Sequence, residues 1–381
     1  MMMIKTATPG ASLPTLALFV ITLGSTAASE LRSQRNQAPS AKTAARKIDQ
    51  LVEADLARHE ATPNARLTEA GFVRRAYLAI LGRIPSTDET RRFLGSRSST
   101  KRSRLIDELL DSPGHVSHMT NYWADVLRAK SRLKSGSGEA YLHFIKQSIA
   151  ENKPYDQFVT EMLTSEGSAM ERGNGAVNYY VRDRGMPEDN MSNTVRVFLG
   201  TRLECAQCHN HPFDKWKQKE FFEMSAFTGG ISYRHQFVDS DDPGAKLLGM
   251  VREMKRDDKK MVAKAASKIT QSLGYGIAGS GTGQTLLPHD YQYDDFAPGQ
   301  RIRAKSMFGE DVPLEYAAEK KKPNPKASAK RRRLKAPAID SRVDYAAWMT
   351  SPSNPRFTTV VANRLWKRLM GRGLIEPLDD M

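Results

Sequence analysis

The sequence predicts a mainly α-helical protein, and three observations lead to this prediction. Apolar residues recur at spacings of three and four through most of the first 230 residues, which is the period of a helix with one buried face. No run of alternating apolar and polar residues indicates strands in that part of the chain. Glycine and proline separate the periodic segments, as at 82–85 and 153–154. We therefore predict a multi-helix domain with long loops.

Each predicted helix is placed by its own apolar pattern. Ser86 and Glu89 have the spacing of a capping box, which marks the start of one helix. Residues 245–273 are strongly charged and predict a longer inserted helix, and 274–283 predict a glycine-rich loop without the Lys-Ser or Lys-Thr of a phosphate-binding loop. The remaining periodic segments are 45–56, 72–81, 86–94, 101–111, 116–127, 139–150, 155–164, 190–198 and 221–227.

The first residues predict export from the cytoplasm. Lys5 is followed by an apolar run at 13–23 that is too short to span a bilayer, and then by small residues at 24–29. This order is typical of a signal peptide, so we expect residues 1–28 to be cleaved; an uncleaved anchor is the alternative. Residues 29–44 are polar and predict a disordered leader. Either form places the protein in the periplasm or at the cell surface.

Composition and charge exclude several classes of protein. A length of 381 residues allows two or three domains, and the negative mean hydropathy excludes a multi-span membrane protein. The net charge of +15 is concentrated in nine basic residues between 320 and 335, within a predicted solvated linker at 319–339. Contact with an anionic surface is the alternative for this run. No aromatic residues accompany it, so we expect no specific nucleic-acid binding.

One short motif carries the chemistry. The only two cysteines, Cys205 and Cys208, are separated by two residues and followed at once by His209. This is the spacing for c-type haem attachment, in which two thiols form thioethers with the porphyrin and the adjacent imidazole binds the iron. Export also places the thiols where such attachment takes place. We predict Cys205 and Cys208 as haem anchors and His209 as the proximal iron ligand.

Other sites remain open at the same motif. Zinc or another divalent metal is the alternative cofactor, bound by the two cysteines with His209 and His211, or completed by His235 or His289. A disulfide between the cysteines is the second alternative. The count of cysteines excludes a four-cysteine zinc site.

Residues around the motif have supporting roles in these predictions. Asp214 could orient an imidazole by accepting its N–H, as carboxylates near metal sites do. We expect Phe213 and Trp216 to pack the motif against the next helix. Four residues are candidates for the opposite side of the iron, although none is singled out and a five-coordinate iron is the alternative. These candidates are Met224, His235, Met250 and Met254.

A resemblance extends over much of the chain. It rests on FVRRAYL at 72–78, GRIP at 82–85, NYW at 121–123, PYDQFV at 154–159 and CAQCHNHPFDKW at 205–216. Together these resemble the planctomycete cytochrome C-like family, also named domain of unknown function 1549, over residues 45–232. The resemblance implies a haem-attachment site at Cys205, Cys208 and His209. Asn210 departs from the family pattern, in which an acidic residue is often found.

The second half of the chain completes the predicted domain arrangement. LPHDYQYDD at 287–295 resembles a connector found in one branch of the family, within an insertion at 233–318. WMTSPSNP at 348–355, NRLW at 363–366 and GRGLI at 371–375 resemble the opening of the usual companion domain, named domain of unknown function 1553. We therefore expect residues 340–381 to be the start of a truncated second helical domain.

These observations lead to one functional hypothesis and its rivals. We expect an exported protein that binds haem c and serves electron transfer or redox sensing with an unidentified redox partner. The rival is an extracytoplasmic scaffold or interaction protein whose Cys/His cluster binds a structural metal or forms a disulfide. No hydrolase motif is present, so whether the protein is an enzyme stays open.

Overall fold

A computed structural model describes residues 40–133, 136–169, 171, 173–183, 185–234, 243–254, 264, 269, 275–308, 311–312, 314 and 340–381. The expected signal segment, most of the leader, the basic run at 320–335 and His235 lie outside these residues. Helices dominate the described residues, which confirms the predicted fold class. No helix in the described part of the chain is long and apolar enough to cross a bilayer.

The chain divides into two compact units, of which the first ends at Thr68. Its described helix is α2 (Ala41–Arg58), which begins earlier than the apolar periodicity predicts. Ser40 accounts for the earlier start, because its side chain accepts a hydrogen bond from the Thr43 amide at 3.2 Å and caps the helix. A side-chain cap thus starts the helix inside the segment expected to be a disordered leader.

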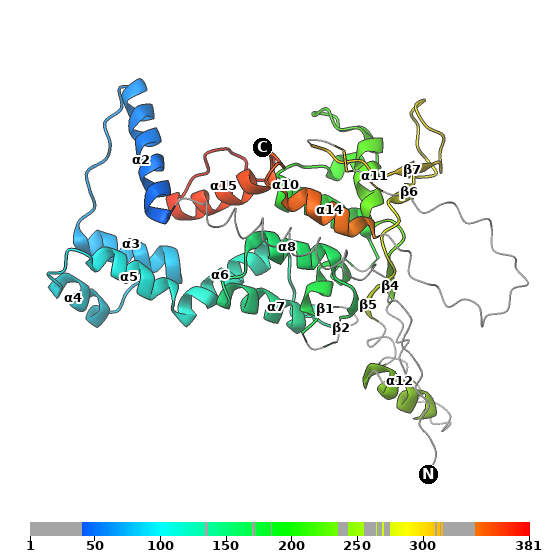
Figure 1. The fold of residues 1–381 in the computed structure, drawn as a ribbon, viewed down its shortest axis with the longest axis horizontal. Coiled ribbons are helices and arrows are strands. Elements are labelled where there is room, and N and C mark those ends of the chain that lie inside the picture. Colours follow the sequence, from blue (N-terminus) through cyan, green and yellow to red (C-terminus); the bar gives the residue numbers. More distant parts are fainter. Residues whose placement is uncertain are drawn as a thin grey trace, which may run out of the picture. The chain divides into compact units, whose positions relative to one another are not determined.

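The second unit begins with three short helices that share a small core of their own. These are α3 (Glu69–Leu81), α4 (Thr87–Gly95) and α5 (Lys101–Leu110), drawn in blue and cyan in Figure 1. The predicted capping box is confirmed: Glu89 N–H donates to Ser86 Oγ at 3.2 Å, and Ser86 N–H donates to Glu89 Oε2 at 2.7 Å. The buried residues of this core are Val73, Ala76, Tyr77, Phe93, Leu105 and Leu109.

The main core is built from the helices that follow. They are α6 (Pro113–Val126), α7 (Glu139–Ala150), α8 (Tyr155–Thr164), α9 (Asn178–Val181), α10 (Pro187–Leu199) and α11 (Gln218–Ser225), with short 3-10 turns between them. Aromatic rings fill much of this core; Phe144 and Phe158 stack with their centroids 5.3 Å apart. The predicted helices in this region are confirmed to within a few residues at their ends.

Short strands are the main difference from the predicted fold. β5 (Tyr275–Ala278) lies between β3 (Gly167–Ser168) and β4 (Ser232–Arg234), with both neighbours antiparallel. The segment predicted as a glycine-rich loop therefore contains the central strand of a sheet, because fully buried Ile277 anchors it in an apolar cluster. The other described strands are β1 (Arg132–Leu133) with β2 (Gly136–Ser137), and β6 (Gln284–Leu286) with β7 (Arg301–Arg303).

The inserted charged helix is described in part. α12 (Pro243–Met254) covers the start of the expected helix at 245–273, and most of the remainder lies outside the described residues.

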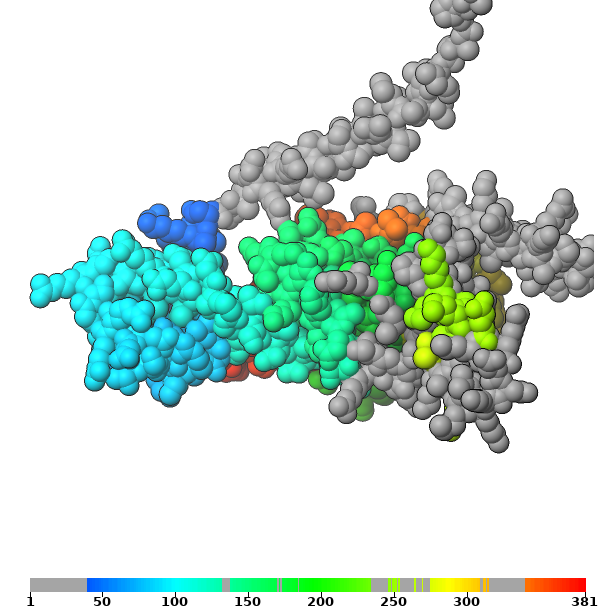
Figure 2. All heavy atoms as spheres, turned by 90° about the horizontal axis from the view of Figure 1, so that it is seen from below, coloured from blue at the N-terminus to red at the C-terminus, as the bar shows by residue number. Residues whose placement is uncertain are grey.

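The C-terminal segment completes the main core. It forms α14 (Ser341–Thr350) and α15 (Phe357–Met370), and Figure 2 shows the orange segment against the green helices of the same unit. Tyr345 is fully buried and stacks on Phe227 with ring centroids 4.9 Å apart. The residues assigned from sequence to a second domain therefore lie in the same compact unit as the helices before them.

One buried arginine joins this segment to the rest of the core. The Arg342 side chain is 1% exposed, and its Nη2 donates to Asp340 Oδ2 at 2.7 Å. Arg342 Nη1 donates to the Ser165 carbonyl at 2.9 Å, just beyond α8. Asp340 Oδ1 also accepts the Gly281 amide at 2.7 Å, beyond β5. A buried ion pair with these hydrogen bonds ties three distant segments together.

We expect Arg342→Ala to lower the free energy of unfolding by about 3 kcal/mol, because it leaves Asp340 and the buried carbonyl without the arginine. Chemical denaturation followed by circular dichroism measures the change. The matched control is Arg372→Ala, which removes an exposed arginine and should change the free energy by no more than about 0.5 kcal/mol. Equal small effects of the two substitutions would show that the Arg342 pair does not hold the segment.

Candidate functional site

The cysteine motif lies on a short turn between α10 and α11. Leu203 and Ala206 are buried at 1% and 0% exposure and fix a 3-10 turn at Glu204–Gln207 in the core. Cys205 and Cys208 are free and exposed, one within the turn and one after it. The Cys208 amide donates to the Cys205 carbonyl at 3.2 Å, which links the backbones of the two cysteines. Two accessible thiols thus flank a turn that the core immobilises.

His209 follows directly and is exposed. Its Nδ1 lies 2.8 Å from the Asn210 carbonyl oxygen. A carbonyl only accepts hydrogen bonds, so this contact assigns the proton to Nδ1 and leaves the lone pair on Nε2. Histidines that bind metals through Nε2 are commonly oriented by such a bond from the other nitrogen. In the neutral ring, this contact therefore leaves Nε2 able to act as a ligand.

A hydrogen-bond network braces the residues around His209. The Asn210 amide donates to Tyr293 Oη at 2.7 Å, and Asn210 Oδ1 accepts the Gln218 amide at 2.9 Å. Gln218 Nε2 donates to the Gln207 carbonyl at 3.1 Å, and Gln207 Nε2 donates to Ser192 Oγ at 2.6 Å. The network links the motif to α10, α11 and the segment at 287–295. Asn210 departs from the family pattern, and its two hydrogen bonds connect the motif to Tyr293 and to Gln218.

The segment at 287–295 is itself held against α11. Tyr291 Oη donates to Asp295 Oδ1 at 2.6 Å, and Lys219 Nζ lies 3.0 Å from Asp295 Oδ2. These two hydrogen bonds hold the pKa of the Asp295 carboxyl below its usual range. The rings of Tyr291 and Tyr293 meet edge to face with centroids 5.3 Å apart. This packing orients the Tyr293 hydroxyl that receives the Asn210 amide. The sequence places both tyrosines in the connector resemblance at 287–295 and predicts no role for them at the cysteine motif.

The residues after His209 differ in part from their expected roles. The His211 amide donates to the Trp216 carbonyl at 2.8 Å and closes a loop, with Phe213 within it. Trp216 is buried, as expected of a packing residue, and it packs edge to face on Phe308, which lies outside the helix expected as its partner. Phe213 is 95% exposed, so its expected packing role is wrong, because the loop directs it away from the core.

His211 and Asp214 make local contacts. The Phe213 amide donates to His211 Nδ1 at 3.3 Å, so Nδ1 is the acceptor and the ring N–H lies on Nε2. Asp214 Oδ1 accepts the Lys215 amide at 2.6 Å, whereas His209 Nδ1 bonds the Asn210 carbonyl. A backbone carbonyl thus contacts His209 in this structure, and the orienting role expected of Asp214 stays a prediction.

The other candidate ligands differ in their burial and lie on different elements. Met224 is fully buried in the main core, Met250 is exposed on α12, and His289 is exposed after β6. Met254 ends α12. Within the described residues, no group of three or more His, Cys, Asp or Glu side chains is placed to hold a metal ion. The structure does not select one of these residues as a further ligand.

The surroundings of the motif decide what kind of haem site would fit. The free thiols and the Nε2 lone pair of His209 match covalent attachment with one axial imidazole. A hollow of about 340 Å³ beside Trp216 has mainly polar and charged walls, and burial raises the pKa of the Glu223 carboxyl. Its other lining residues are Glu220, Lys305, Ser306, Met307 and Asp311. Charged walls of this kind do not form an apolar crevice for a porphyrin. If a haem is attached here, Cys205, Cys208 and His209 would hold it at the surface of the described residues.

The comparison with protein families matches two segments of the chain. Residues 47–233 match PSCyt2, described as a protein of unknown function (DUF1549). Over these residues the chain is similar to this family. The PSCyt2 match includes the cysteine motif and its bracing residues on α10 and α11, whereas Tyr293 lies beyond it.

A second match covers the C-terminal helices. Residues 341–381 match PSD1, described as a protein of unknown function (DUF1553). The two matches confirm the family resemblance inferred from sequence and its domain order. No curated protein and no solved structure matches the chain.

We expect Tyr293→Phe to loosen the motif, because the Asn210 amide loses its hydrogen-bond acceptor. The Asn210 amide should exchange with deuterium about fivefold faster, which corresponds to the loss of one hydrogen bond of about 1 kcal/mol. Amide exchange measured by nuclear magnetic resonance tests this. Tyr291→Phe removes a hydroxyl that bonds Asp295 and should leave the Asn210 rate nearly unchanged. Identical rates in the wild type and Tyr293→Phe would exclude the brace.

Proposed function

We propose that the protein attaches one haem c through Cys205 and Cys208, with His209 as axial ligand, and serves electron transfer or redox sensing outside the cytoplasm. The observation that carries the proposal is the His209 contact, in which Nδ1 lies 2.8 Å from the Asn210 carbonyl and Nε2 stays free. The adjacent Cys-x-x-Cys spacing supplies the two thiols that the attachment requires. The redox partner and the exported location are part of this proposal.

The thiols support the attachment by their accessibility. In thioether formation each S–H adds across a vinyl group: sulfur bonds to one vinyl carbon and hydrogen to the other, with no leaving group. Both Cys205 and Cys208 are free and exposed, so a porphyrin edge can approach either of them. The turn between them is anchored by buried Ala206, which limits their relative movement. A pre-ordered pair lowers the entropy cost of forming the second bond.

The bracing network supports His209 in the same role. Asn210 is held on both sides, by Tyr293 and by the Gln218 amide, so the carbonyl that orients His209 is itself immobile. When bound, haem supplies a reversible one-electron couple, and the chain's part is to hold the axial imidazole and shield one face. Phe213 stands exposed close to the thiols in sequence and can cover apolar porphyrin surface.

A pyridine haemochrome spectrum and an intact mass test the proposal, using protein exported in a host with a cytochrome c maturation system. We expect a c-type band and a mass increase of one haem. Cys205→Ala/Cys208→Ala should lose both signals. His211→Ala is the matched control and should retain both, because His211 has no part in the attachment.

Two outcomes would overturn the proposal in favour of its rival. Protein with bound zinc, lost in His211→Ala as well as in the cysteine variant, would indicate a structural metal cluster. Protein with an intact disulfide and no haem would indicate a structural or redox cysteine pair. Either result would favour an extracytoplasmic scaffold or interaction protein. Contact of the basic run at 320–335 with an anionic surface stays a separate prediction.

A further inference from the structure

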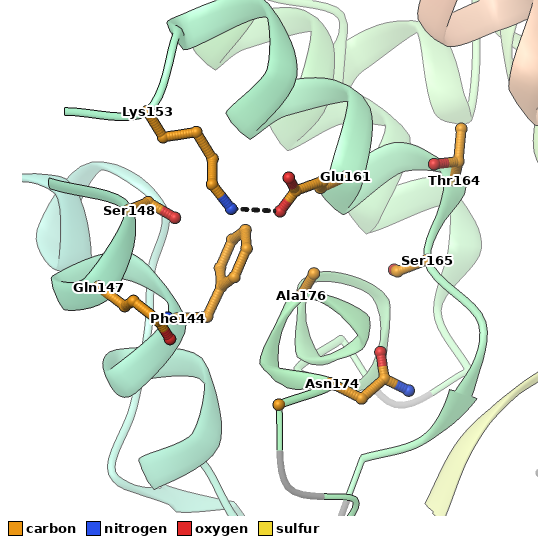
Figure 3. A pocket seen from close by; sticks show the side chains of 10 residues that line it. Phe144, Gln147, Ser148, Lys153, Glu161, Thr164, Ser165, Asn174 and Ala176 are labelled. Carbon is orange, nitrogen blue, oxygen red and sulfur yellow. Dashed lines mark hydrogen bonds and ion pairs between the residues drawn. The ribbon is translucent and has the colours of Figure 1, made fainter. Parts of the chain in front are cut away.

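A second hollow lies away from the cysteine motif, between the end of α7, α8 and the loop at 173–176. Its volume is about 320 Å³, which is in the range of small-molecule sites. Figure 3 shows side chains from all three walls pointing toward it. The residues that carry the argument are Phe144, Ser148, Lys153, Glu161, Asn174 and Ala176.

The walls of the hollow are fixed by backbone contacts. Asn152 adopts a φ of +47° after α7, and the Lys153 amide donates to the Ser148 carbonyl at 2.8 Å. This left-handed turn directs Lys153 over the hollow. Asn174 Nδ2 donates to the Glu166 carbonyl at 2.7 Å and so holds the opposite loop. The hollow is therefore shaped before any ligand arrives.

Ser148 has a hydroxyl that the fold leaves unused. The residue is 4% exposed, it lines the hollow, and its Oγ has no hydrogen-bond partner within the described residues. Figure 3 shows this oxygen directed toward the side of the hollow where Lys153 lies. Buried hydroxyls are usually hydrogen-bonded, because desolvation without a partner costs stability. A ligand in the hollow would supply the missing partner.

The charged groups of the hollow cancel. Lys153 Nζ and Glu161 Oε2 form an ion pair at 2.6 Å across one side, and the remaining lining residues are neutral. The hollow thus offers no net charge to an anion or a cation. It offers a hydroxyl at Ser148 on one wall and the amide oxygen of Asn174 on the opposite wall. Ala176 and part of the Phe144 ring add apolar surface.

We propose that this hollow binds a neutral polyhydroxylated molecule of monosaccharide size. Two neighbouring hydroxyls match the Lys153–Glu161 pair: one accepts from the ammonium and the other donates to the carboxylate, while the ion pair stays closed. A zwitterion such as an amino acid would have to separate the pair to neutralise its own charges. A further ligand hydroxyl bonds to Ser148 Oγ, because hydroxyls both donate and accept.

Saturation-transfer nuclear magnetic resonance on the full chain tests the proposal, with D-glucose, D-galactose and D-mannose as probes and L-alanine as the zwitterionic probe. We expect at least one hexose to bind. Ser148→Ala should weaken it about three- to tenfold, the loss of one hydrogen bond, and Glu161→Gln about tenfold or more, because a charged acceptor is lost. Ser103→Ala is the matched control and should not change binding, because Ser103 lies on α5.

The outcomes separate ligand binding from a defect in packing. The melting temperature of Ser148→Ala should not fall, because the substitution removes an unpartnered buried hydroxyl. Weaker hexose binding at unchanged stability supports the site. The proposal is overturned if no hexose binds, if Ser148→Ala binds the sugar as tightly as the wild type, or if L-alanine binds more tightly than every hexose.

Discussion

The buried guanidinium of Arg342 is the constraint on which the arrangement of the second unit depends. A charge at 1% exposure is tolerated only where an opposite charge and hydrogen-bond acceptors surround it. Asp340 and the Ser165 carbonyl meet this requirement, and they come from chain segments far apart in sequence. The C-terminal segment must therefore return to the end of α8. Its apolar residues then enter the core, where Tyr345 stacks on Phe227.

The same packing extends to the cysteine motif. Phe227 follows directly after α11, so the stack with Tyr345 fixes the end of that helix. The other end of α11 begins with Gln218, whose amide and side chain bond Asn210 and the Gln207 carbonyl. A helix held at its far end thus presents two hydrogen bonds to the turn that carries the thiols. The exposed site owes its order to buried aromatic contacts one helix away.

Features that depend on residues close in sequence were predictable, and features that depend on residues far apart in sequence were not. Helices depend on local periodicity and caps, so α3 to α8 and the capping box at Ser86 were predictable. The strands are two to four residues long, and β5 is defined by partners such as Gly167, far away along the chain. No local pattern contains that pairing. The Gly167–Ile277 register appears only once the chain has folded.

The same distinction holds at the site. Cys205, Cys208 and His209 were found because their chemistry depends on adjacent positions. The hydroxyl that braces Asn210 comes from Tyr293, 83 residues away, and no spacing rule connects the two. For Phe213 the local pattern was misleading. An aromatic residue near a helix suggests packing, but the loop closed by the His211–Trp216 backbone hydrogen bond leaves this ring exposed.

The filled core has a consequence for how a haem would be held. Leu203, Ala206 and Met224 are buried in the main core, so the described residues around the turn are closely packed. Under the haem proposal, a haem bound to this turn would cover a core that is already filled. Its contribution to stability would then come from the surface that it covers. Such a site would suit contact with a partner at the surface more than storage of a shielded cofactor.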